Sequence, residues 1–169
     1  LLKLDPAGNE VWFRVCGGGI VDVVNDMQLT SSGELLMCGD LRGSMFFLDG
    51  STDVIDTEDD YACFLLLADP DGEHVRHSVL GSDSPVSAKA IDQRGDTVAM
   101  LGTFQCQFAD LTEHYAADGL FMATGPQDLF VSKHVFSTLQ LHGAQQFGGQ
   151  WPKQAGGITS NTDGQVLFC

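Results

Sequence analysis

Basic residues are scarce in this chain. Its 169 residues include 8 Lys+Arg against 23 Asp+Glu, which gives a formal net charge of −15. Such an excess of carboxylates repels phosphate backbones and anionic lipid headgroups. We therefore expect neither nucleic acid nor an anionic membrane surface as a partner.

Long apolar runs are lacking as well. The longest covers about six residues, "CFLLLA" at Cys63–Ala68, whereas a membrane-spanning helix needs about 20. The sequence therefore predicts no membrane span. It also lacks a charged segment followed by an apolar one near its start, so any secretion signal would have been removed or would lie outside these residues.

Recognisable catalytic and cofactor motifs are missing too. No G-x-S-x-G occurs, and the glycine runs Gly17–Gly19 and Gly148–Gly149 lack the Lys-Ser/Thr of a phosphate-binding loop. No C-x-x-C pair occurs, which argues against a zinc knuckle or a thioredoxin-like site. The five cysteines are Cys16, Cys38, Cys63, Cys106 and Cys169. Buried free thiols are one interpretation, and a disulfide from Cys63 or Cys106 is the alternative for a secreted protein.

What the chain does contain is a repeat. "TSSGELLMCG" at Thr30–Gly39 returns as "DQRGDTVAMLG" at Asp92–Gly102 and as "NTDGQVLFC" at Asn161–Cys169. Their central glycines are 62 and 69 residues apart, and "LDPAG" at Leu4–Gly8 recurs as "ADPDG" at Ala68–Gly72. Because glycine supplies the positive φ that tight turns need, we expect five turn glycines: Gly8, Gly33, Gly72, Gly95 and Gly164.

The apolar segments between these turns are short. In the second copy they are Phe64–Asp69, His74–Leu80, Ala88–Asp92 and Asp96–Leu101, called a, b, c and d in that order. Links of hairpin size join a to b and c to d, and this predicts a four-stranded antiparallel meander. Repeated units that cannot each bury a face alone favour radial stacking, so the fold class expected is an all-β β-propeller.

This pattern also resembles a known family. An apolar strand, Asp-x-x-Gly, a strand ending in Gly-Gly, apolar-x-x-Asp-x-x-Gly-Asp and an apolar strand ending in Gly are similar to the bacterial β-propeller repeats called SBBP repeats. Phe64–Gly102 carries the likeness best. The resemblance implies a secreted or cell-surface protein, extracellular or periplasmic. Two departures stand out, because the d-to-a connectors are longer than is usual and the third copy lacks its Asp-Pro turn.

The expected organisation is one propeller segment spanning 1–169. Its units cover approximately 1–39, 64–102 and 130–169, joined by long connectors at 40–63 and 103–129. Read in order, the strands run ab, cdab, cdab, cd, or about three blades, while closed propellers use about four to eight. We therefore expect a segment of a longer chain, with assembly of several copies as the alternative.

An acidic run lies in the first connector. "DVIDTEDD" places Asp53, Asp56, Glu58, Asp59 and Asp60 within eight residues. A solvated acidic loop is one interpretation, and a Ca²⁺ site is the other, since Ca²⁺ takes about six to eight oxygen ligands. In the second case calcium would raise the melting temperature. The similar "DPDGE" at Asp69–Glu73 is interpreted as a hairpin turn.

The histidines give a weaker signal. His74 and His77 lie three residues apart on an expected strand, so alternation places them on opposite faces and predicts no shared metal. The other histidines, His114, His134 and His142, have no partner at zinc-site spacing. The tryptophans Trp12 and Trp151 are expected to pack between blades, although Trp151, beside Pro152, is also a candidate partner contact.

Two function classes follow from these patterns. The first is a non-enzymatic secreted or surface propeller that serves as an interaction scaffold or as a subunit of an extracellular assembly, with connector loops as its binding rim. The second is a propeller-fold glycan hydrolase or lyase with paired carboxylates in its channel. Asp92 and Asp163 are its first candidates, but they fall near equivalent repeat positions, which favours turn capping.

Overall fold

The structure is a computed structural model that describes residues 1–169 except 19, 48–53, 106, 111–120 and 162; the side chains of 54, 58–60 and 107–110 are also outside the description. The chain is all-β, and its described residues contain no helix. No helix in that part of the chain is long and apolar enough to cross a membrane.

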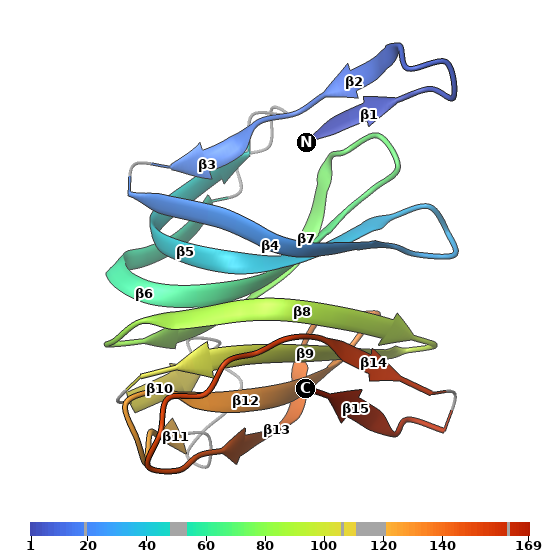
Figure 1. Cartoon of the computed structure of the whole chain (residues 1–169). Coiled ribbons are helices and arrows are strands. Elements are labelled where there is room, and N and C mark those ends of the chain that lie inside the picture. The colour runs from blue at the N-terminus through green and yellow to red at the C-terminus, as the bar shows by residue number, and fades with distance from the viewer. Residues whose placement is uncertain (19, 48–53, 106, 111–120, 162) are drawn as a thin grey trace.

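Two four-stranded antiparallel meanders form the body of the protein (Figure 1). Meander 1 consists of β4 (Val21–Leu29), β5 (Leu35–Phe47), β6 (Val54–Ala68) and β7 (His74–Ser82). Meander 2 consists of β8 (Val86–Arg94), β9 (Thr97–Phe104), β12 (Asp128–Val135) and β13 (Leu141–Phe147). The short strands β3 (Cys16–Gly18), β10 (Gln107–Asp110) and β11 (Phe121–Met122) extend the sheet of meander 1.

A two-stranded hairpin lies at each end of this stack (Figure 1). The N-terminal hairpin, β1 (Leu2–Leu4) and β2 (Glu10–Phe13), faces meander 1, and the C-terminal hairpin, β14 (Ile158–Ser160) and β15 (Val166–Phe168), packs on meander 2. Each hairpin forms a sheet of its own. The order along the stack is therefore hairpin, meander, meander, hairpin.

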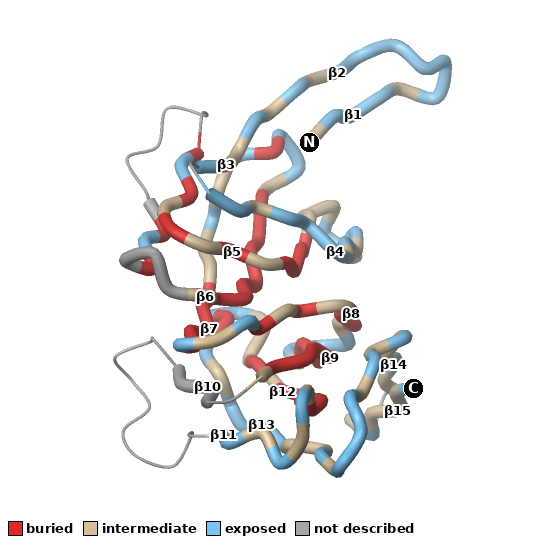
Figure 2. Tube along the Cα trace, turned by 60° about the vertical axis from the view of Figure 1, so that its left-hand side comes forward, coloured by how far each residue is buried: buried red, intermediate tan, exposed pale blue. Residues whose placement is uncertain are grey.

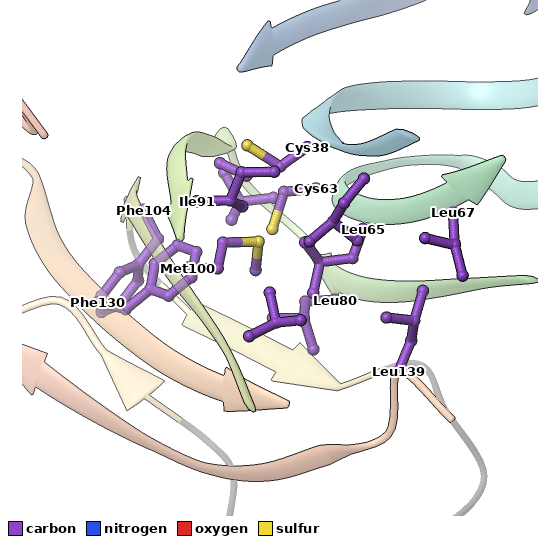
Figure 3. Close-up of a cluster of buried hydrophobic side chains, with 14 residues drawn as sticks. Cys38, Cys63, Leu65, Leu67, Leu80, Ile91, Met100, Phe104, Phe130 and Leu139 are labelled. Carbon is purple, nitrogen blue, oxygen red and sulfur yellow. The ribbon is translucent and has the colours of Figure 1, made fainter. Parts of the chain in front are cut away.

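The main core lies between the two meanders. Cys38, Cys63 and Leu65 from meander 1 pack against Met100 and Phe130 from meander 2 (Figure 3). The other face of meander 1 carries a second cluster that includes Met37 and Phe64, and the far face of meander 2 carries a third around Leu101 and Val131. Because alternate residues of each strand point to opposite sides, each meander contributes apolar side chains to a cluster on either face. Figure 2 shows that the buried residues are concentrated in the meanders and not in the two hairpins.

The two meanders share a close packing detail. Gly39 of β5 lies opposite Phe64 of β6, and Gly102 of β9 lies opposite Phe130 of β12. In both pairs an added Cβ on the glycine would approach the phenylalanine ring, to 2.8 Å at Gly39 and 2.4 Å at Gly102. Only glycine leaves room for the ring, so these pairs fix the same register in both meanders.

Four hairpin turns share one construction. In the turn Asp69–Glu73, the Asp69 carboxylate accepts hydrogen bonds from the backbone N–H groups of Asp71 and Glu73, both at 2.9 Å. The turns at 5–9 and 161–165 have the same bonds, and the turn at 30–34 has the second of them. The Asp69–Glu73 segment is therefore a turn, as expected.

All five expected turn glycines have positive φ, from 58° at Gly95 to 87° at Gly8. The third a-to-b turn, which lacks Asp-Pro, instead has Leu139 at φ 57°, a conformation that is unusual for a branched side chain. Leu139 is fully buried and belongs to the main core cluster.

The sheets do not group the strands as the second copy suggested. Strands b and c of that copy are β7 and β8, which belong to different sheets, so each meander runs c, d, a, b. Much of the expected connector 40–63 is also strand, because β5 continues to Phe47 and β6 begins at Val54. Similarly, β10 and β11 fall within the connector 103–129. Main-chain pairing, which local turn signals do not report, extends the strands beyond the repeat.

Candidate functional site

The N-terminal end of the stack is half covered. The N-terminal hairpin is tied to meander 1 where the Trp12 indole N–H and the Lys3 ammonium both donate to the Pro70 carbonyl, at 3.1 and 2.8 Å. The apolar residues of strand β4 remain largely exposed, with exposed fractions of 56% for Met27 and 66% for Leu29. An open apolar groove of about 270 Å³, the N-terminal groove, is lined by Leu2, Trp12, Met27, Leu29, Leu35 and Pro70 among others.

The C-terminal end is half covered in the complementary way. The C-terminal hairpin places Ile158, Val166 and Phe168 against the third cluster on meander 2. Most of β13 stays exposed. Beside the hairpin, an open C-terminal groove of about 370 Å³ is lined by Val131, Lys133, Ala144, Phe147, Val166 and Phe168 among others. Leu167 of β15 is 72% exposed.

Polar side chains of β4 form hydrogen bonds with the backbone along one edge of β8. Among the described strands, β8 pairs with β9 alone, so its other edge presents backbone groups that no described strand pairs with. Asp26 accepts from the N–H of Ile91 at 2.9 Å, and Gln28 accepts from the N–H of Gln93 at 2.7 Å. Asn25 donates to the Ala88 carbonyl at 2.7 Å. These bonds join the two meanders along one edge.

Asp92 forms a similar side-chain link between meander 2 and the C-terminal hairpin. Its carboxylate accepts from the backbone N–H of Ser160 at 2.7 Å and also from the Ser160 hydroxyl, which joins β8 to the C-terminal hairpin. Asp163 lies exposed in the turn at 161–165, where Asn161, not Asp163, provides the side-chain acceptor. The two carboxylates suggested for an enzyme are therefore an inter-sheet link and a turn residue.

A polar cleft of about 330 Å³ lies between the meanders. Its lining includes Asp40, Arg42, Tyr61, Ser87, Lys89 and Gln127. The Asp40 carboxylate accepts from Ser87 at 2.6 Å and from Asn25 at 2.9 Å, with Lys89 at 3.7 Å. Among the described residues that line this cleft, Asp40 is the one carboxylate, and glycoside hydrolysis generally needs two.

The candidate calcium ligands are only partly described. Asp53 lies outside the described residues, and Glu58, Asp59 and Asp60 lie in β6 with side chains outside the description. Asp56, also in β6, is exposed. No group of three potential metal ligands occurs among the side chains that the structure describes.

The two strand histidines do not lie as expected. In the pairing of β6 with β7, Leu67 lies opposite Arg76 and Ala68 opposite His74, so Val75 is an extra residue in a β-bulge. The bulge shifts the alternation by one position, and the imidazoles of His74 and His77 meet. Nε2 of His74 lies 3.1 Å from Nδ1 of His77. The prediction of opposite faces was wrong because strand alternation does not continue through a bulge.

The cysteines described by the structure are free thiols, namely Cys16, Cys38, Cys63 and Cys169. Burial raises the pKa of Cys38 to about 12 and places that of Cys63 well above its usual value. These two thiols are therefore core residues without nucleophilic character at neutral pH. Cys169 is exposed, so the interpretation of buried free thiols does not hold for it. Cys106, the other candidate for a disulfide, lies outside the described residues.

Trp151 projects from a loop that is held firmly. Its side chain is 76% exposed. The neighbouring Lys153 exchanges two hydrogen bonds with Gln127, from Lys153 N–H to the Gln127 carbonyl at 3.0 Å and from the Gln127 amide to the Lys153 carbonyl at 2.8 Å. An exposed indole on a fixed loop has the character of an interface residue. Trp151 therefore does not pack in the core of the described chain.

Asp128 organises the adjacent segment. Burial acts to raise the pKa of Asp128, but hydrogen bonds from Thr124 and Gln146 outweigh this and bring the pKa below its usual value. The Thr124 N–H lies 2.7 Å and the Gln146 amide 2.8 Å from the carboxylate. Sequence inspection missed this residue, because nothing local marks Asp128 as buried.

No family model, curated protein or solved structure matches this chain. Its function must therefore be inferred from the geometry of the two half-covered ends, the polar cleft and the histidine pair.

Proposed function

We propose that this protein is a non-enzymatic scaffold of β-propeller type, and that it functions by binding further blades of the same repeat at its two ends. Meanders 1 and 2 are two blades in this proposal. The N-terminal hairpin corresponds to strands a and b of another blade, and the C-terminal hairpin to strands c and d. The repeated glycine–phenylalanine pairs and the shared turn construction support this assignment.

The single observation that carries the proposal is the complementarity of the two ends. The N-terminal groove lies where c and d strands would cover β4 and β5, and the C-terminal groove lies where a and b strands would cover β12 and β13. Each hairpin is the half-blade that the opposite groove lacks. Two copies joined head to tail would supply about six blades, within the four to eight of closed propellers.

The pairing of β5 with β6 in meander 1 predicts which residues of the two copies would lie opposite each other in this contact. There, Leu35 pairs with Ala68, Met37 with Leu66 and Cys38 with Leu65. The turns at 30–34 and 161–165 match, as do those at 69–73 and 5–9. By this correspondence, Val166 of one copy would lie opposite Leu4 of the next, Phe168 opposite Leu2 and Cys169 opposite Leu1.

The structure of the polar cleft gives no support to the enzyme alternative. Asp40 is held by internal partners, and Asp92 links two sheets. The proposal includes a secreted or cell-surface location, because the repeat pattern resembles repeats of secreted and surface proteins. Blades of the same repeat, in a longer polypeptide or a second copy, are the partners it names, and Trp151 is an additional exposed anchor for them.

Cross-linking tests both the self-association and its register. In a Cys16→Ser background, which removes the thiol that lines the same pocket as Leu1, Leu1→Cys should form an intermolecular disulfide with Cys169 under mild oxidation. Leu2→Cys is the matched control, because its side chain would point to the opposite face. Light scattering should give twice the 18.1 kDa of one chain. A chain that stays monomeric when concentrated, and equal cross-linking by both variants, would each contradict the proposal.

A further inference from the structure

His74 and His77 form a pair of converging nitrogen donors on one face of meander 1. Both belong to β7, and the bulge at Val75 brings their side chains together. Their ring centroids lie 5.2 Å apart, and Nε2 of His74 is 3.1 Å from Nδ1 of His77. Both side chains are half-buried, so solvent still reaches the pair.

The distance between these nitrogens suits a chelated metal ion. Imidazole nitrogens bind Zn²⁺ at about 2.0–2.1 Å. An ion about 2.1 Å from each of two nitrogens that are 3.1 Å apart subtends an N–metal–N angle of about 95°, between the 90° of square or octahedral and the 109° of tetrahedral coordination. The ion would sit beside the line that joins the two nitrogens, so each ring must turn modestly from its present hydrogen bond.

The surroundings of the pair restrain the tilt of the His74 ring. The Phe47 ring stacks on His74 with centroids 4.3 Å apart and planes at 16°, which limits the tilt of the imidazole. Arg14 is the cationic side chain among the residues that line the small pocket beside His74, and its guanidinium lies 5.7 Å from the Trp12 ring centre, in stacking range. The chain as a whole, at −15, attracts cations.

We propose that His74 and His77 chelate a divalent late transition metal ion of the Zn²⁺, Ni²⁺ or Cu²⁺ class. Imidazole suits these ions, whereas Ca²⁺ and Mg²⁺ take oxygen ligands. The proton now shared between Nε2 and Nδ1 moves to the other nitrogen of the ring that carries it, so two neutral imidazoles bind the ion without net proton release. No third described ligand joins them, and water or a partner's side chain fills the remaining positions.

Titration with the metal alone tests the proposal. Calorimetry with ZnCl₂ in a non-chelating buffer should show one ion per chain for the wild type. His74→Gln and His77→Gln, measured separately, should each weaken binding on the order of 10²-fold, because the second nitrogen of a chelate binds at high effective concentration. His142→Gln is the matched control, since His142 is an exposed β13 residue, and it should leave binding unchanged.

A spectroscopic measurement on the wild type removes any dependence on how the variants fold. Electron paramagnetic resonance with one equivalent of Cu²⁺ should show hyperfine splitting from two imidazole nitrogens. Circular dichroism then confirms that each variant keeps its sheet structure. Splitting from one nitrogen or none, or Zn²⁺ affinity that survives both substitutions in folded variants, would overturn the assignment. Because the pair lies within one chain, these outcomes do not depend on whether copies associate.

Discussion

Acidification should destabilise the protein through a single buried histidine, His134. This side chain is 1% exposed, and burial lowers its pKa from 6.5 to about 4. Nδ1 lies 3.1 Å from the Leu139 carbonyl, which can only accept, so Nδ1 carries the proton. Nε2 then accepts from the Ser132 hydroxyl at 3.0 Å. The neutral ring satisfies both contacts, and a second proton would enter a site that offers it no counter-charge among these partners.

The size and the sign of this pH dependence follow from the difference in the pKa of His134 between the folded and the unfolded chain. Below pH 6.5 the unfolded chain protonates His134 while the folded chain does not, so the free energy of unfolding falls as the pH falls from 6.5 towards 4 and then levels off. The full difference between the two pKa values of His134 corresponds to about 3 kcal/mol of unfolding free energy, at about 1.36 kcal/mol per pKa unit. Between pH 7 and pH 5 the expected loss is about 2 kcal/mol.

Urea unfolding at several pH values, followed by circular dichroism, measures this loss. His134→Gln removes the titrating group while keeping an amide donor and acceptor, so wild type should lose about 2 kcal/mol more than the variant between pH 7 and pH 5. His142→Gln, an exposed control, should follow wild type. Parallel pH profiles for wild type and His134→Gln would refute the reasoning, as would an NMR titration showing His134 protonated above pH 5.5 in the folded protein.

Three further substitutions test the packing, the sheet-to-sheet links and the turns. Gly102→Ala places a Cβ 2.4 Å from the ring that covers it and should cost about 1–3 kcal/mol in urea unfolding, whereas Gly143→Ala, with no atom within 4 Å, should cost far less; equal effects would contradict the close-packing argument. Asp92→Ala removes the bonds to Ser160 and should raise hydrogen exchange in β14 and β15 more than in β5 and β6; uniform exchange would contradict the link. Asp69→Ala should lower stability by about 1 kcal/mol through loss of the turn bonds, and an unchanged unfolding midpoint would show that the turn does not need them.

Much of the secondary structure was accessible from local patterns in the sequence. The five turn glycines and the Asp-Pro-x-Gly turns mark hairpins, because positive φ and side-chain capping are local properties. Alternating apolar residues likewise predict strands. The boundary between sheets is different in kind: whether His74–Leu80 pairs with the strand before it or the one after it depends on contacts between distant residues.

The same limit applies to the candidate sites. Nothing in "HVRH" shows that Val75 forms a bulge, since a bulge depends on what the neighbouring strand presents, and that bulge decides whether His74 and His77 meet. Similarly, His134 and Asp128 resemble ordinary polar strand residues until the stacking of sheets encloses them. Turn chemistry could be predicted, whereas the enclosure of polar groups required the tertiary structure.

The links between neighbouring sheets also have a mechanical consequence. Hydrogen bonds from Trp12 and Lys3 hold the N-terminal hairpin, and those of Asp92 and Lys133 hold the C-terminal one. The hairpins lie at opposite ends of the stack, so a pulling force applied between β1 and β15 loads the sheets in series. The strands of the hairpins, which are three or four residues long, would peel away at low force, while the long β5–β6 ladder would resist. Under tension the protein would therefore lose its two hairpins, and the grooves that they line, before it lost its core.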